Sequence, residues 1–332
     1  MKLRPKTACR VWGTVLAAIL AGSAAAQTAD FSKRLIEGQR LRDRAQFAEA
    51  RTVYQALLRD VRQNPSERDF EALVWAYLGV NEQDSGDYGA AETAYNHGLA
   101  AVHSQTADNA ILAALETHLA ELYIAEGRAD DAEPMIRQAV AALRSSATPD
   151  RVSLATANED LAVVCIMRRK LSPEPEALLR QSQTLLESVY GPEDPRVTSS
   201  LLTYAGLMTE HRRYAEAVVP AEHAWQILDA HSPSVPKAYL ASALNVMAAV
   251  YYHTGRRDKA ESCARKSVDL ATSSIGPTHP RLGLYLANFA FILKSAGHKN
   301  EAKAVQKQAD AILNHSPVSG SGGYTVNIAS LR

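Results

Sequence analysis

The sequence lacks the features that mark several large classes of protein. Only three of its 332 residues are cysteine, too few for a fold stapled by disulfides. Lysine plus arginine and aspartate plus glutamate both number 36, so no excess of positive charge points to nucleic acid. No glycine-rich phosphate loop, HExxH, GxSxG or CxxC motif occurs. We therefore expect a protein that is not an enzyme and that has no cofactor and no metal site.

No apolar run is long enough for a comfortable membrane span, but a shorter one lies near the N-terminus. Four positive residues in the first ten precede the apolar stretch 11–21, and Ala24 and Ala26 fit an A-x-A cleavage site before Gln27. This pattern is typical of a secretory signal peptide. We expect residues 1–26 to be removed and the protein to be exported, to the periplasm or beyond. An uncleaved anchor is the alternative.

What the sequence does contain is a repeat of 40–45 residues. Each unit has a turn followed by a short polar phrase that ends in alanine, as in "DYGAA", "RYAEA" and "RDKA". These anchor residues recur along most of the chain: Ala50, Ala91, Ala132, Ala177, Ala217, Ala260 and Ala302. A fixed period of this length is the mark of a repeat architecture.

A small residue precedes most anchors by twelve positions, usually with a large apolar residue directly before it. The small residues are Gly38, Gly79, Ala120, Ala205, Ala248 and Ala290, and Ala162 fits the fourth unit if that unit carries three extra residues. Spacings of 3, 4 and 7 place such residues on one helix face, and small side chains let two helices approach closely. Each unit is therefore predicted to be helix A, a tight turn and helix B, in an all-α array over residues 30–315.

The joint between units is also repeated, as "GPEDPR" at 191–196 and "GPTHPR" at 276–281. Gly276 and Pro277 are expected to end one helix, His279 to cap the next, and Pro280 to occupy its first position, where a missing N–H costs nothing. Asp194 and Pro195 are expected to do the same in the earlier joint.

These residues resemble the tetratricopeptide repeat, and the period of about 42 residues with the G-P-x-H-P joint resembles its kinesin-light-chain type. The unit "ALNVMAAVYYHTGRRDKAE" at 243–261 carries the resemblance best, whereas the first unit and "RRKLSPEPEALL" depart from it. The resemblance implies a right-handed α-solenoid with a concave groove lined by the A helices, which binds a protein or peptide.

Carried onto this chain, the groove positions hold a set of polar and aromatic residues. They are Gln39, Arg42, Gln83, Glu121, Glu159, Thr209, Asn245, Tyr252, His253, Asn288 and Lys294. Asn245 and Asn288 are the strongest candidates for ligand contact, because an amide both donates to and accepts from a peptide backbone. The alternative is that they only stabilise the solvated groove wall. The mixed charges do not resemble a basic clamp for a carboxylate terminus.

Positive residues gather in the predicted A–B turns. They are Arg168, Arg169, Lys170, Arg212, Arg213, Arg256, Arg257 and Lys299. Because equivalent turns of a solenoid stack along one edge, we expect a basic ridge there. The simpler explanation is that cations favour the C-terminal end of a helix.

Two further expectations concern the cysteines and the tail. Cys165 and Cys263 fall on different helices two repeats apart and are predicted to be free. Residues 316–332 read as a flexible glycine and serine linker with a short β-prone end, "YTVNIASLR".

The leading function is an exported, non-catalytic scaffold for a protein or peptide partner. The alternatives are a structural or accessory envelope protein that binds anionic material through the basic ridge, and an enzyme accessory subunit. The sequence identifies neither the partner nor the oligomeric state.

Overall fold

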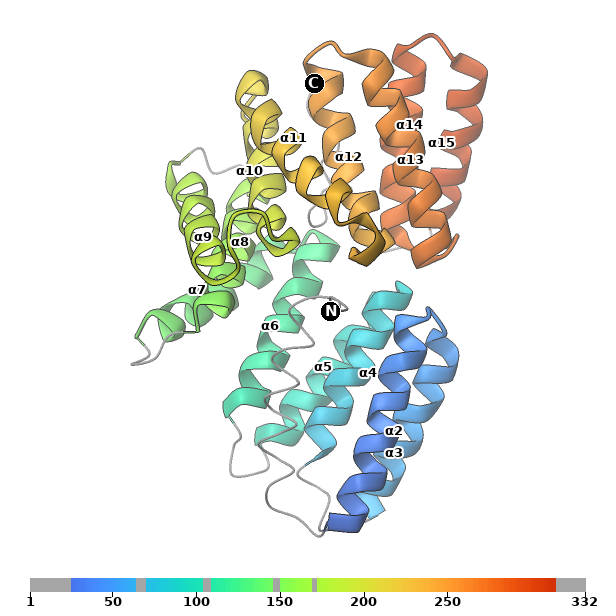
Figure 1. Ribbon diagram of the computed structural model, residues 1–332. Helices are drawn as coiled ribbons and strands as arrows, with labels where there is room; N and C mark the ends of the chain where they lie inside the picture. The colour runs from blue at the N-terminus through green and yellow to red at the C-terminus, as the bar shows by residue number, and fades with distance from the viewer. Residues whose placement is uncertain (1–24, 64–69, 104–108, 146–149, 169–171, 315–332) are drawn as a thin grey trace. The chain divides into compact units, whose positions relative to one another are not determined.

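The computed structural model describes residues 25–63, 70–103, 109–145, 150–168 and 172–314, and over these residues the chain is an all-α solenoid. It has seven consecutive helix pairs and, within the described ranges, no strand (Figure 1). The pairs are α2 (Ala25–Asp43) and α3 (Phe47–Gln63), α4 (Glu71–Ser85) and α5 (Tyr88–His103), α6 (Asn109–Glu126) and α7 (Ala129–Ser145), α8 (Arg151–Met167) and α9 (Glu174–Tyr190), α10 (Thr198–Glu210) and α11 (Tyr214–Ala230), α12 (Lys237–His253) and α13 (Arg257–Ile275), and α14 (Pro280–Ser295) and α15 (Lys299–Leu313). We call these pairs repeats one to seven. The predicted helical array is confirmed.

The helices fall into two compact units that divide within α6, one up to Leu122 and one from Tyr123 onward. The predicted signal peptide lies almost wholly outside the described residues, and the predicted tail lies outside them entirely. None of the described helices is long and apolar enough to cross a membrane.

The small residue of each A helix lies in the core, as the repeat pattern predicts. In the second repeat, a Cβ atom added to Gly79 would lie 2.4 Å from the Tyr95 ring, and in the first repeat one added to Gly38 would lie 2.5 Å from the Tyr54 ring. Both tyrosines are fully buried. These contacts are far shorter than van der Waals distance, so glycine is required for the two helices to pack.

In the second unit, alanine replaces glycine at this position. Ala162, Ala205 and Ala248 are fully buried, and Ala290 is 3% exposed. The residue that corresponds to Tyr95 in α11 and α13 is also alanine, Ala221 and Ala264. In the fifth and sixth repeats, an alanine on helix A is thus matched by an alanine on helix B.

The anchor predicted for the fourth repeat is wrong by one residue. Ala177 is exposed, whereas the next residue, Leu178, is buried together with Ser182 and Leu186, as the residues at the same spacing in α7 are. The chain enters α9 through Pro173 at its N-cap. Because the segment before this helix is longer than in the other repeats, counting from the alanine motif misses the register.

The A–B turns use left-handed backbone, which glycine adopts without strain. Gly86, Gly127, Gly255 and Gly297 all have φ between 78° and 91°. In the "HRR" turn of the fifth repeat, which has no glycine, Arg212 takes this conformation with φ 58°.

The repeated joint is built as predicted. His279 Nδ1 accepts a hydrogen bond from the Arg281 backbone N–H at 3.1 Å, and Asp194 accepts one from the Arg196 N–H at 2.9 Å. Pro280 is the first residue of α14, while Pro195 opens a short 3₁₀ helix, Pro195–Val197, that leads into α10. The two joints share the cap but differ in the turn that follows it.

Candidate functional site

The two asparagines expected to contact a ligand are buried instead. Asn245 on α12 is 1% exposed and Asn288 on α14 is 2% exposed. The Asn288 amide donates to the Asn245 side-chain carbonyl at 3.0 Å, which links the A helices of the sixth and seventh repeats. Their side chains are therefore not presented to a ligand as expected. The two residues are 43 positions apart on consecutive A helices, and the hydrogen bond between them joins these helices.

Two more of the predicted groove residues belong to the interior. Glu159 on α8 is 3% exposed and accepts hydrogen bonds from the hydroxyls of Ser182, at 2.8 Å, and Ser199, at 3.2 Å. Thr209 on α10 is fully buried and its hydroxyl donates to the backbone carbonyl of Ala205 at 2.8 Å. The exposure expected for both is wrong, because these positions pack against neighbouring helices.

Two of the remaining predicted residues of the second unit, Tyr252 and His253, belong to an aromatic patch, which we define as Tyr214, Tyr252, His253 and Phe291. The Tyr252 ring lies edge-on to Phe291, with centroids 5.2 Å apart, and edge-on to His253 at 5.1 Å. His253 in turn stacks on Tyr214 at 4.6 Å. All four side chains are half-buried, so the patch combines a fixed arrangement of rings with access to solvent.

Positive charge surrounds the aromatic patch. The Arg257 guanidinium lies 3.9 Å from the Tyr252 ring centroid, a cation–π contact, and Lys294 is exposed on α14. Burial, together with Arg257 and Arg212, lowers the pKa of His253. The lowered pKa favours the neutral imidazole, and the buried Nε2 atom of His253 has no hydrogen-bond partner within the described residues.

Three of the predicted residues of the first unit, Arg42, Gln83 and Glu121, lie near Tyr95. The Tyr95 hydroxyl donates to the Gln83 side-chain carbonyl at 2.8 Å, and burial raises the pKa of this phenol well above its usual value. Arg42 pairs with Asp84 at 3.4 Å, and Glu121 lies 3.1 Å from His118. Gln39 is half-buried on α2. Gln83, Arg42 and Glu121 thus already have polar partners within the first unit, and fewer of their polar atoms are available to a ligand than in the aromatic patch.

The basic ridge is much less positive than the sequence suggests. Arg168 pairs with Asp130 and Glu133, Arg213 with Glu176 and Glu216, and Arg256 with Glu222. In each case a carboxylate comes from helix B of the preceding repeat, 34–37 residues earlier. Arg212, Arg257 and Lys299 have no carboxylate partner within the described ranges, and Arg169 and Lys170 lie outside them. Ion pairs thus offset much of the predicted positive edge.

Sequence reasoning missed two members of the site. Tyr214 is the first residue of helix B in the fifth repeat, and Phe291 lies on α14. Phe291 could have been found from the sequence, because it precedes its anchor Ala302 by eleven residues, as the predicted groove residues Gln39 and Glu121 precede theirs. The stacking of Tyr214 on His253 requires the packing of α11 beside α12, which the pattern alone does not reveal.

The described part of the chain contains two cysteines and no cluster of side chains that could bind a metal ion. Cys165 and Cys263 form no disulfide, as predicted, and burial raises the pKa of the Cys263 thiol to about 11. No group of three or more histidine, cysteine, aspartate or glutamate side chains is placed to hold a metal ion in the ranges described.

Comparison with known families identifies the repeat. Residues 239–314, which form most of α12 and all of α13–α15, match the tetratricopeptide repeat model. A separate comparison with curated proteins found no match.

Solved structures share the fold at low sequence identity. A Rap protein complexed with Competence and Sporulation Factor is 11% identical, with a TM-score of 0.64 over 96% of this chain and 81% of that one. The Rap conjugation gene regulator of plasmid pLS20, in complex with the Phr* peptide, is 12% identical, with a TM-score of 0.60 over 86% and 74%. A kinesin light chain repeat protein of Podosopora anserina is 20% identical, with a TM-score of 0.44 over 59% and 92%. The two Rap structures, at identities this low, show likeness of fold alone.

Proposed function

We propose that this tetratricopeptide repeat protein is an exported, non-catalytic scaffold that binds a protein or peptide through the aromatic patch of its fifth to seventh repeats. The observation that carries the proposal is the half-buried ring cluster of Tyr252, His253 and Phe291, flanked by Arg257 and Lys294. Aromatic side chains and arginine are enriched at protein interfaces. The Rap regulator in complex with the Phr* peptide has a similar fold, which supports a peptide as the class of ligand.

The aromatic patch suits recognition because its side chains are already ordered. Tyr252 touches both Phe291 and His253, and Arg257 covers one face of its ring. A ligand that contacts Tyr252 would lose little additional side-chain entropy on binding, which favours affinity. Lys294 adds an exposed charge that can pair with an acidic or carbonyl group of the ligand.

Binding of anionic material through the basic ridge is the second candidate. Ion pairs occupy Arg168, Arg213 and Arg256, so only part of the ridge is available for an anion. Exposed charges of this kind steer association more than they select a partner. We therefore place specificity in the aromatic patch.

The double change Tyr252→Ala with Lys294→Ala is expected to weaken partner binding about tenfold to a hundredfold, since 1.4 kcal/mol corresponds to about tenfold. A pull-down with the tagged mature protein from its own envelope fraction supplies the partner, and isothermal titration gives the affinity. Thermal melts should stay close to the parent, because Tyr252 is half-buried and Lys294 is exposed.

The matched control is Lys299→Ser, which removes one unpaired charge from the basic ridge. This variant should bind with a slower association rate and a flatter salt dependence at nearly unchanged affinity. If it lost binding while the Tyr252 and Lys294 variant kept it, recognition would be through the ridge instead.

Export is the part of the proposal that rests on the N-terminal pattern. The mature chain is expected to begin near Gln27, because Ala24 and Ala26 precede it in an A-x-A site. N-terminal sequencing of protein recovered from the exported fraction decides the point. A chain that still begins at Met1 would favour an anchor over a cleaved signal.

A further inference from the structure

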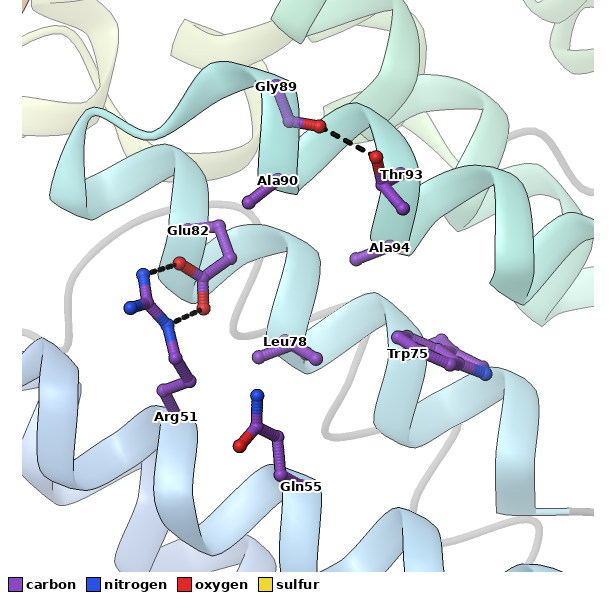
Figure 2. A pocket seen from close by; sticks show the side chains of 9 residues that line it. All are labelled: Arg51, Gln55, Trp75, Leu78, Glu82, Gly89, Ala90, Thr93 and Ala94. Carbon is purple, nitrogen blue, oxygen red and sulfur yellow. Dashed lines mark hydrogen bonds and ion pairs between the residues drawn. The ribbon is translucent and has the colours of Figure 1, made fainter.

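An opening lies within the first unit, between the B helices of repeats one and two. Its volume is about 360 Å³. Figure 2 shows the side chains that line it. The floor comes from α4, with Trp75, Leu78 and Glu82, and the walls come from α3 and α5, with Arg51, Gln55, Gly89, Ala90, Thr93 and Ala94. We call it the B-helix slot. Its volume falls within the range of about 300–1,000 Å³ that is usual for ligand pockets.

The slot is open because α5 presents small side chains to it. A Cβ atom added to Gly89 would meet nothing within 4 Å, and the neighbours along this face are Ala90, Thr93 and Ala94. The Thr93 hydroxyl is already used, since it donates to the Gly89 carbonyl at 2.9 Å (Figure 2). The α5 wall therefore presents mainly carbon to an occupant.

The same place between α13 and α15 is closed by a side-chain bridge. Arg265 lies five residues after its anchor, with its guanidinium carbon 4.9 Å from the Phe289 ring centroid, and donates to Glu301 at 2.9 Å. The residues at the same offsets in the first two repeats are Gln55, Leu78 and Ala90. None of these three residues can form such a bridge. The B-helix slot is therefore left open, whereas side chains of the protein itself fill the equivalent place between α13 and α15.

The charges inside the slot already satisfy each other. Glu82 is 2% exposed, and its two carboxylate oxygens accept from Arg51 Nε, at 2.7 Å, and from Arg51 Nη2. This ion pair raises the pKa of Arg51. A charged occupant would leave water without gaining a partner of opposite charge, which is unfavourable. An uncharged apolar group gains contact with Leu78, Ala90 and Ala94 instead.

From this geometry we infer that the B-helix slot binds one large uncharged side chain of a protein partner, of the leucine or phenylalanine kind, as an anchor. Anchors of this type in small apolar pockets often dominate an interface. The slot lies in the first unit, on different helices from the aromatic patch, and the inference rests on the proposed function only in that the partner is a protein.

The test uses the full chain and isolated amino-acid amides as probes, so it does not depend on a partner. N-acetyl-leucinamide and N-acetyl-phenylalaninamide are titrated while the indole N–H signal of Trp75 is followed by NMR. N-acetyl-lysinamide and N-acetyl-aspartamide are the charged comparisons. We expect saturable shifts of the Trp75 signal with the two uncharged probes and none with the charged ones. The indole of Trp225, which lies on α11 in the second unit, should not respond.

The decisive variant is Gln55→Arg with Ala90→Glu, which recreates the bridge of Arg265 and Glu301 across the slot. It should weaken the uncharged probes at least tenfold, and Ala90→Leu, which fills the slot without charge, should do the same. The control Thr52→Arg with Ala48→Glu adds the same charges to exposed positions of α3 and should bind like the parent. Unchanged binding in both closed variants, equal binding of charged probes, or no saturable shift with either uncharged probe would overturn the inference. If the Tyr252→Ala, Lys294→Ala variant bound its partner like the parent, the proposed function would be wrong, but the inference about the B-helix slot would stand.

Discussion

Ala248→Leu is expected to lower the free energy of unfolding by about 1–3 kcal/mol or more, since inserted methylenes in a packed core force neighbours to move. Ala248 is fully buried on α12 and lies twelve residues before its anchor, the same offset at which Gly79 packs on Tyr95. Ala290→Leu on α14 should behave alike, because Ala290 is 3% exposed at the same offset. Thermal and urea unfolding followed by circular dichroism measure both effects.

The control for these variants is Ala177→Leu, which makes the same chemical change at an exposed helix position. Its unfolding should differ from the parent by no more than about 0.5 kcal/mol, as for most surface substitutions. If Ala177→Leu were as destabilising as Ala248→Leu, the register of the fourth repeat in the structure would be wrong. If all three variants melted with the parent, the close approach of the helices would be wrong.

The second large effect concerns pH and the joint before α14. Burial, with a smaller contribution from Arg281, lowers the pKa of His279 to about 3. In the unfolded chain a histidine titrates near pH 6.5. Because the folded pKa is the lower one, the contribution of His279 to stability is complete above pH 6.5 and is lost as the pH falls toward 3. At pH 5 the loss is about 2 kcal/mol, at 1.36 kcal/mol per pKa unit.

His279→Asp should keep the cap and remove this loss. Asp194 shows that a carboxylate serves the same joint, where the Arg196 side chain lowers its pKa. The variant should therefore change less in stability between pH 7.5 and pH 5 than the parent, by about 2 kcal/mol. Urea unfolding at both pH values gives the difference. Parallel curves for the parent and the variant would show that His279 is not held neutral by the fold.

Much of this fold was predictable from spacing alone. A small residue twelve positions before an alanine is a local regularity, and the close packing of Gly79 on Tyr95 follows it. The caps of His279 and Asp194 were equally predictable, because a cap depends on only two or three neighbouring residues. The prediction of Ala177 as an anchor was wrong, because the segment before α9 is longer than in the other repeats and the chain enters this helix through Pro173.

The candidate site was less predictable because its properties depend on partners distant in sequence. Nothing local shows that Asn288 donates to Asn245, 43 residues earlier. The charge of the basic ridge was overestimated for the same reason, since Arg213 meets Glu176, 37 residues before it. A side chain's offset in a repeat gives its face of the helix, whereas its exposure depends on what the adjacent helix contributes.

The paired sizes of Gly79 with Tyr95, and of the small residues Ala248 and Ala264, limit how freely the repeats can be exchanged. A chimera that placed the second helix of repeat two after the first helix of repeat six would set a tyrosine ring against an alanine methyl. The reverse chimera would set a methyl where the ring was and leave a cavity. Recombination within the array is therefore tolerated only where both helices of a repeat move together.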